Sequence, residues 1–183
     1  MRTRDIAFIA LFAALTCALA FFPAIEIPGV PAPITAQTLG VMLAGSIIGA
    51  RRGGLALLLF VILVAVGLPV LPGGRGGLGV LLGPSGGFIL SWPIAAFVIG
   101  YLTERFWKRY NLGIALAANF VGGVLVVYLI GIPFMAVVAT IGLGTAITAS
   151  AIFVPGDLIK VVIASLAAVA VRRAYPVIEE SRA

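Results

Sequence analysis

The sequence predicts an all-α, polytopic membrane protein with six transmembrane helices and a capped pocket that faces away from the cytoplasm. Mean hydropathy is +1.25, hydrophobic residues make up 62% of the chain, and charged residues make up only 10%. A water-soluble domain of 183 residues needs a far larger charged surface. Long apolar runs alternate with short segments rich in proline, glycine or arginine. We therefore expect residues 1–183 to form a single integral-membrane domain.

The first span is predicted over residues 6–22, because an apolar run of roughly 20 residues is long enough to cross a bilayer. Pro23 ends this run. Arg2 and Arg4 precede it, as basic residues precede the apolar core of a signal peptide. The run is, however, one of several in the chain, and this favours a transmembrane helix.

The second and third spans are predicted over residues 36–50 and 54–68. The second is short for a span, and Arg51 and Arg52 follow it. Pro69 stops the third. The next segment, residues 73–87, is too rich in glycine to predict a helix and too apolar for an ordinary solvated loop.

The fourth span is predicted over residues 88–105, with Trp107 and Tyr110 at the interface that aromatic residues prefer.

The fifth span is predicted over residues 112–131, ending near Pro133. Residues 134–150 are uncharged and apolar, and two readings stay open: they extend the fifth helix past a kink, or they dip back into the bundle. The sixth span covers residues 155–173, with Pro155 at a favourable first-turn position.

Basic residues near the ends of the helices predict the orientation of the chain. Cytoplasmic N- and C-termini place ten of the twelve Lys and Arg residues on the cytoplasmic side, and only Arg75 and Lys160 on the outer side. We expect the ten to anchor the protein against anionic membrane lipid, so nucleic-acid binding is not expected. They are Arg2, Arg4, Arg51, Arg52, Arg105, Lys108, Arg109, Arg172, Arg173 and Arg182.

Irregular segments concentrate on the opposite, outer half of the predicted bundle. Nine of the eleven prolines and the glycine-rich segment 73–87 fall there. Irregular backbone at membrane depth persists only where it is buried in protein or lines a cavity. We therefore expect a structured cavity in the outer half, roofed by loops.

Asp157 and Lys160 are the strongest candidates for a binding site, together with Arg75. Charges at membrane depth are costly and are usually functional. Asp157 and Lys160 are three residues apart, so they share one face of the sixth helix. Either they form a local salt bridge that anchors the helix, or they are a pocket wall that offers one acceptor and one cation.

Two outer segments supply further candidates. The glycine-rich segment can cap the bundle or offer backbone groups to a ligand, with Gly77, Ser85 and Gly86 as contacts. It is not a dinucleotide fingerprint, because no strand precedes it. Thr35 can cap the second helix, and Gln37 and Thr38 can point into the cavity.

Ala10, Ala14 and Ala18 form a stripe of small residues along the first helix. Small residues let helices approach closely in lipid, so the stripe either packs within the bundle or is a docking face for another membrane protein. The chain lacks histidine and has a single cysteine, Cys17, so no internal disulfide, catalytic centre, metal site or cofactor is expected.

Several motifs, in order along most of the chain, together resemble the BioY family of biotin-binding S components. They are Pro33-Ile34-Thr35-Ala36-Gln37-Thr38-Leu39, Gly49-Ala50-Arg51-Arg52-Gly53, Gly67-Leu68-Pro69-Val70, Gly76-Gly77-Leu78-Gly79, Gly83-Pro84-Ser85-Gly86-Gly87 and Phe153-Val154-Pro155-Gly156-Asp157-Leu158-Ile159-Lys160.

The resemblance implies a six-helix subunit of an energy-coupling-factor transporter in the cytoplasmic membrane of a prokaryote. Such a subunit captures a vitamin outside the cell and docks on a transmembrane coupling protein and two ATPases. The alanine stripe of the first helix would meet the coupling protein, and Asp157 and Lys160 would contact biotin. Arg75 is a second candidate partner for the biotin carboxylate, and which cation meets which end of biotin stays open.

Three alternatives remain at this point: an S component for another vitamin, such as thiamin or riboflavin, a small membrane enzyme, and a structural membrane subunit without a ligand. The chain contains no GxxxxGK[ST] motif, so ATP hydrolysis by this subunit is not expected.

Overall fold

Helices make up the regular structure of residues 2–178, which are the residues that the computed structural model describes. Within this range, pairing of the β type is limited to two isolated bridges, Ile25 with Ile34 and Leu71 with Arg75. The α-helices are α1 (Thr3–Ala18), α2 (Gln37–Ile48), α3 (Ala50–Ala65), α4 (Leu78–Leu81), α5 (Gly86–Arg105), α6 (Leu112–Phe120), α7 (Val127–Val138), α8 (Leu143–Ser150) and α9 (Val154–Ala174). A π-helix, Val121–Val126, joins α6 to α7, and 3-10 turns lie at Leu19–Phe21, Pro72–Gly74, Trp107–Arg109 and Ala151–Phe153.

The six expected spans all fold as helices, which confirms the all-α membrane fold, but they differ in length. Four helical segments between residues 2 and 178 are long and apolar enough to cross a membrane: Thr3–Phe21, Gly86–Arg105, Leu112–Val138 and Leu143–Ala174. By contrast α2 has 12 residues, a length of about 18 Å against a hydrocarbon core of about 30 Å. Helix α2 is therefore too short to cross the membrane by itself, and the loop before it covers the remaining depth.

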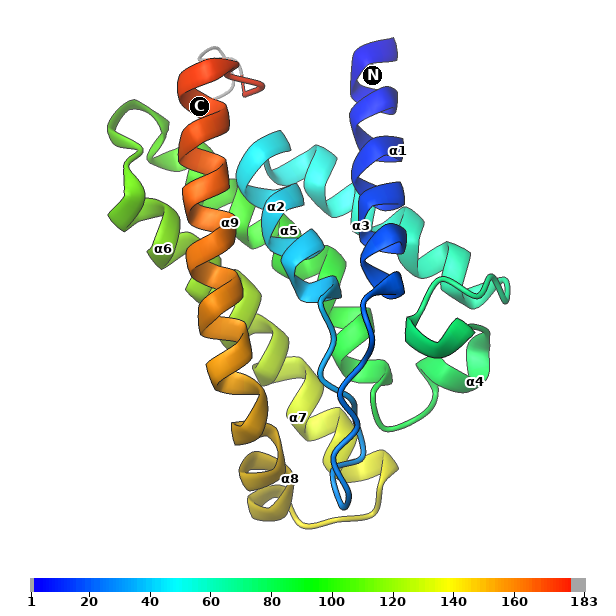
Figure 1. Cartoon of the computed structure of the whole chain (residues 1–183). Helices are drawn as coiled ribbons and strands as arrows, with labels where there is room; N and C mark the ends of the chain where they lie inside the picture. The colour runs from blue at the N-terminus through cyan, green and yellow to red at the C-terminus, as the bar shows by residue number, and fades with distance from the viewer. Residues whose placement is uncertain (1, 179–183) are drawn as a thin grey trace.

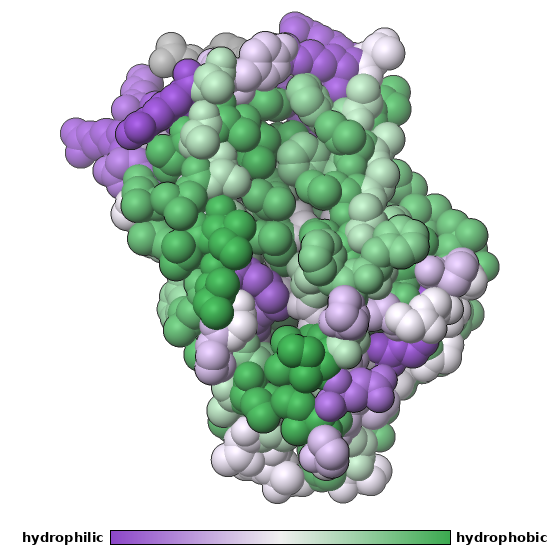
Figure 2. Space-filling model, viewed as in Figure 1, coloured by the Kyte–Doolittle hydropathy of each residue, from purple (hydrophilic) through white to green (hydrophobic). Residues whose placement is uncertain are grey.

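The sides of the bundle expose the large apolar side chains that a lipid-facing surface requires. Leu129 is 76% exposed and Val137 is 77% exposed. On the face that Figure 2 shows, apolar residues form a broad band below the hydrophilic upper edge, and further hydrophilic residues lie among apolar ones in the lower half. In water such a surface would drive aggregation, so the chain is a multi-pass membrane protein.

Helix α3 begins at Ala50, four residues before the expected start at residue 54. Gly49 makes the break between α2 and α3, with a φ of +83° that favours glycine. Arg51 and Arg52 lie in the first turn of α3 and not in a loop. The charge of Arg52 is tolerated there because its Nε lies 2.9 Å from Oδ1 of Asp5 in α1.

The fifth span is longer than expected, because its helix continues through Pro133 to Val138. Of the two readings for residues 134–150, extension of the helix therefore holds as far as Val138. Residues 143–150 instead form α8, which leads through a 3-10 turn into α9. Pro155 lies in the first turn of α9, as expected.

The glycine-rich segment 73–87 is not free of helix, which corrects the expectation for it. Leu78–Leu81 form the short helix α4, because Gly77 adopts a φ of +90° that starts the turn. The amide of Gly77 donates to the carbonyl of Val64 at 2.7 Å, which fastens this loop to the end of α3.

The two ends of the bundle differ in character (Figure 1). Both termini lie at one end, which we call the terminal end, where α1 begins and α9 ends. The opposite, loop end carries the connection of residues 22–36, together with α4 and α8. Arg182, one of the basic residues used to predict the orientation, lies outside the described residues.

Candidate functional site

Asp157 is the centre of a buried polar cluster near the loop end. Its side chain lies in the first turn of α9, and the residue is only 5% exposed. Oδ2 accepts a hydrogen bond from the Tyr128 hydroxyl at 2.7 Å. Oδ1 accepts from Lys160 Nζ at 2.9 Å and from Thr38 Oγ1 at 3.3 Å. The cluster thus joins α2, α7 and α9.

Lys160 completes this cluster from the next turn of α9. Its ammonium donates to Thr38 Oγ1 at 2.9 Å and to the carbonyl of Thr35 at 2.6 Å, in addition to Asp157. All three donors of the ammonium are therefore used by groups of the protein. The cost of burying the charge is offset by the carboxylate and by these hydrogen bonds.

The local sequence explains why these groups meet. Pro155 lies in the first turn of α9, and Asp157 follows in the same turn, where the helix dipole favours a carboxylate. Thr38 lies in the first turn of α2, whose N-terminus reaches the same end of the bundle. The three-residue spacing then places Lys160 on the face of Asp157.

A cavity of about 50 Å³ lies beside this cluster, and we call it the polar cavity. Its polar lining comprises Thr35, Thr38, Tyr128, Asp157 and Lys160. Its apolar lining comprises Pro33, Ile34, Phe88, Val127 and Phe153. Pockets for small molecules usually hold roughly 300–1,000 Å³, so a ligand must displace side chains or the segment 33–35 to enter.

Aromatic rings form one wall of the polar cavity. The ring of Phe88 meets that of Tyr128 edge-on, with centroids 6.3 Å apart, and that of Phe153 edge-on at 6.1 Å. Such a wall suits the apolar part of a ligand whose polar part contacts Asp157 and Lys160.

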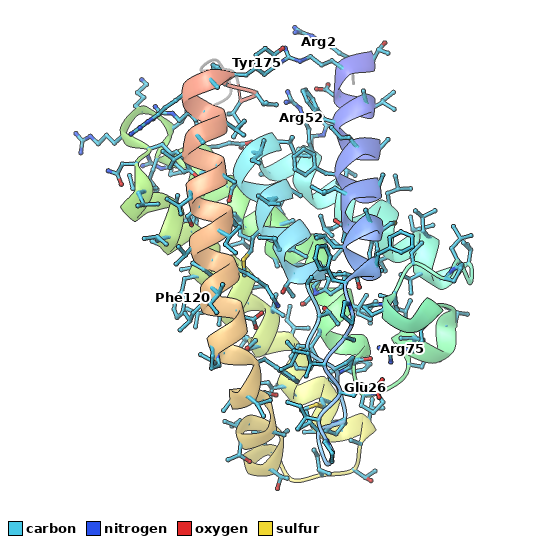
Figure 3. The ribbon with its side chains drawn as sticks, viewed as in Figure 1. Arg2, Glu26, Arg52, Arg75, Phe120 and Tyr175 are labelled. Carbon is cyan, nitrogen blue, oxygen red and sulfur yellow. The ribbon has the colours of Figure 1, made fainter. Side chains whose placement is uncertain are left out.

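A second, open cavity of about 510 Å³, the outer cavity, lies between residues 26–33 and Arg75. Figure 3 shows Arg75 and Glu26 near one another at the loop end. Nε of Arg75 donates to the carbonyl of Pro72 at 3.1 Å, and the side chain lines the cavity. Pro33 lines both cavities, so the outer cavity borders the polar one.

The structure brings together some of the predicted site residues and separates others. Thr38, Asp157 and Lys160 meet in one cluster. Gln37 is fully buried, and its amide donates to the carbonyls of Thr16 and Val70 and not toward the polar cavity. Gly77, Ser85 and Gly86 are absent from the linings of both cavities.

Sequence reasoning assigned Thr35 the alternative role of helix cap, and the structure differs. Ala36 occupies the N-cap position of α2, and no side chain caps this helix. Thr35 instead contributes its backbone carbonyl to Lys160.

Sequence reasoning also missed Tyr128, Phe88 and Phe153. The sequence does contain a signal for Tyr128. Tyrosines of membrane helices prefer the interface, and a phenol in the middle of an uncharged apolar span indicates a buried polar partner.

The alanine stripe faces outward. Ala10, Ala14 and Ala18 are exposed, so they are not buried within the bundle. They line an apolar groove of about 690 Å³ between α1 and α3, whose other lining residues include Leu59 and Leu63. Of the two readings for the stripe, this position favours a docking face.

Comparisons with known proteins place these features in a family. Residues 1–177 match a family model described as the BioY family. A Rhizobium etli protein named biotin transporter BioY is 46% identical over 183 aligned residues, covering 97% of this chain and 98% of the relative. A Rhodobacter capsulatus protein of the same name is 48% identical, covering 90% of this chain and 91% of the relative.

A solved structure shares the fold. It is described as the S-component for biotin from an ECF-type ABC transporter, and it superposes with a TM-score of 0.89 at 31% identity. The match covers 94% of this chain and 95% of the solved chain.

Proposed function

This chain belongs to the BioY family, and we propose that it is the biotin-capturing S component of an energy-coupling-factor transporter. The observation that carries the proposal is the buried Asp157–Lys160 pair, which lies beside a small cavity with an aromatic wall. No step of chemistry is assigned to the chain, and its role is binding and release of the vitamin.

The donor and acceptor groups of the polar cavity match the cyclic urea of biotin. Each edge of that ring presents an N–H beside a C=O. Asp157 offers an acceptor, and Lys160, 2.9 Å away, would offer a donor by exchanging its hydrogen bond to the Thr35 carbonyl for one to the ligand, which is the complementary arrangement. A carboxylate has about four lone-pair sites, and three are used here, so one position on Oδ2 remains for a ligand N–H.

We assign the biotin carboxylate to Arg75. Lys160 is enclosed and fully bonded within the cluster, whereas Arg75 lines the open outer cavity and keeps donors free for an incoming anion. With the urea in the polar cavity, the aliphatic tail would extend past Pro33 toward the outer cavity.

The proposed orientation puts the terminal end in the cytoplasm of a prokaryotic cell and the loop end outside. Nine basic residues of the described chain belong to the terminal half, which is the distribution that cytoplasmic ends of membrane proteins have. Biotin would then reach the outer cavity directly from outside the cell.

The exposed apolar groove between α1 and α3 is the proposed docking surface for the transmembrane coupling protein, which would carry the two ATPases. The exposed alanines allow a partner helix to approach closely. Ala14→Leu would fill the groove and is expected to reduce copurification with the energising module, that is, the coupling protein and its two ATPases. Ala117→Leu, at an exposed position of α6, is the matched control and is expected to leave assembly intact.

Binding by the purified full-length chain tests the ligand assignment. Isothermal titration in detergent is expected to show tight binding of biotin and none of thiamin or riboflavin. Lys160→Gln is expected to lose most of this affinity, whereas Lys108→Gln, an exposed lysine at the other end, retains it. Retention of a different vitamin, or equal binding by both variants, would refute the assignment.

A further inference from the structure

We propose that the terminal end carries a binding site for the headgroup of an anionic phospholipid. The site consists of Arg105, Lys108, Arg109 and Arg173, which we call the cationic patch. All four side chains are exposed. The first three lie at the turn between α5 and α6, and Arg173 lies in the last turn of α9.

The cationic patch differs from Arg52 and Arg172, two basic residues of the same end whose charges are held by protein groups. Arg52 pairs with Asp5 and donates to the carbonyl of Val177. Arg172 donates to two backbone carbonyls. Within residues 2–178, no side chain of the patch makes a hydrogen bond or an ion pair, and the Arg105 guanidinium packs over the Phe106 ring.

The turn that displays the patch is held in one conformation by Arg172. Its Nη1 donates to the Tyr110 carbonyl at 2.6 Å and its Nη2 to the Trp107 carbonyl at 2.7 Å. The guanidinium also lies 4.9 Å from the centroid of the Trp107 ring. The patch is therefore presented on a preorganised turn, which reduces the entropy lost on binding an anion.

Apolar neighbours identify the partner as a lipid. Phe106 is 47% exposed and Leu112 is 40% exposed, so apolar side chains flank the cations on the same turn. Figure 2 shows the hydrophilic surface at the upper left, over this turn, directly adjoining the apolar band. A phospholipid supplies a phosphate for the cations and acyl chains for Phe106 and Leu112 at this level of the membrane.

The position also separates the patch from the proposed protein partner. The α5–α6 turn and α1 lie on opposite sides of the bundle in Figure 1. A coupling protein seated on the α1–α3 groove would leave the patch in contact with the bilayer.

Native mass spectrometry of the full-length chain in mixed micelles tests the proposal. The micelles contain equal amounts of phosphatidylglycerol and phosphatidylcholine, and the bound lipids are counted. The parent protein is expected to retain phosphatidylglycerol in preference. Replacing all four residues of the patch by glutamine is expected to abolish this preference, and each single replacement weakens retention about fivefold, the equivalent of about 1 kcal/mol.

Arg51→Gln is the matched control, because it removes one exposed cation of the same end outside the patch. It is expected to retain the lipid, and an equal loss in Arg51→Gln and Arg109→Gln would overturn the proposal. Unchanged lipid retention in the fourfold variant would also overturn it, and if assembly with the energising module were lost instead, the patch would be a protein-docking surface. Biotin affinity, measured in parallel, shows that the variants are folded.

Discussion

Two buried ion pairs within residues 2–178 have equal lengths and lie toward opposite ends of the molecule, and we expect them to serve different purposes. Asp157–Lys160 and Asp5–Arg52 both have N–O distances of 2.9 Å, and all four side chains are at most 14% exposed. The first pair lies on one helix and borders a cavity. The second joins α1 to α3, and Arg52 also binds the carbonyl of Val177 in the segment after α9.

The comparison teaches that burial and ion pairing alone do not identify a ligand site. The Asp5–Arg52 pair connects segments far apart in the chain, and Figure 3 shows Arg52 and Tyr175 at the same end of the bundle. The Asp157–Lys160 pair connects neighbours on one helix, which the backbone hydrogen bonds of the helix already hold together. What distinguishes it is the adjoining cavity, which gives its remaining acceptor a place to meet a ligand.

The largest expected effect comes from Asp157→Asn. This change leaves the Lys160 ammonium buried without a counter-ion, a loss of about 3–5 kcal/mol for comparable pairs. We expect the Kd for biotin to rise at least a hundredfold, measured by isothermal titration in detergent. Biotin binding within threefold of the parent protein would show that the pair is only a structural tie.

Asp5→Asn tests the other pair and should cost about 3 kcal/mol of folding stability. Thermal unfolding in detergent is expected to shift down by several degrees. The Kd of the folded fraction for biotin should stay unchanged, because the pair lies at the terminal end. A large loss of biotin affinity at unchanged stability would remove the distinction between the two pairs.

Tyr128→Phe sharpens the comparison by removing one hydrogen bond from Asp157. A hydrogen bond to a charged group contributes about 1.5 kcal/mol, so biotin affinity should fall roughly tenfold. Tyr101→Phe, at an exposed tyrosine of α5, serves as the control and should bind biotin like the parent protein. Equal affinities in the two variants would mean that Tyr128 does not orient the carboxylate.

Arg75→Gln should have the smallest effect, because its guanidinium lies in an open cavity where solvent screens the charge. We expect about a threefold to fivefold loss of biotin affinity, consistent with roughly 1 kcal/mol for an exposed pair. Competition with the methyl ester of biotin is the measurement. The ester should bind the parent protein and Arg75→Gln equally, and an equal loss for biotin and its ester would place the carboxylate elsewhere.

Much of the fold follows from the sequence, because apolar runs and prolines are local signals. The spacing of Asp157 and Lys160 likewise predicts a shared helix face, and they do share it. The start of α3 was missed because Arg51 and Arg52 resemble loop residues. Tertiary contacts with Asp5, 47 positions earlier in the chain, and with the carbonyl of Val177 stabilise the buried charge of Arg52 within the helix.

Side-chain direction is what the sequence could not supply at the site. Gln37 and Thr38 are neighbours, and from the sequence either side chain could point into the cavity. In the structure Thr38 donates a hydrogen bond to Asp157, whereas Gln37 donates to the carbonyls of Thr16 and Val70. The choice depends on the rotation of α2 within the bundle. That rotation is set by contacts along its whole length, including Gly45, where a Cβ would lie 2.6 Å from the Ala96 carbonyl oxygen.

The π-helix Val121–Val126 sets the register of one wall of the site. Two hydrogen bonds join its flanking helices to α9, one from Asn119 to Ser165 and one from Tyr128 to Asp157. Nine chain steps separate Asn119 from Tyr128, but only eight separate Asp157 from Ser165, and the wide turn absorbs the extra step. Deleting one residue there would rotate Tyr128 by about 100° relative to Asn119. The two hydrogen bonds could then no longer form together. The extra residue of the π-helix, which does not itself touch Asp157, therefore determines whether the Tyr128 hydroxyl reaches that carboxylate.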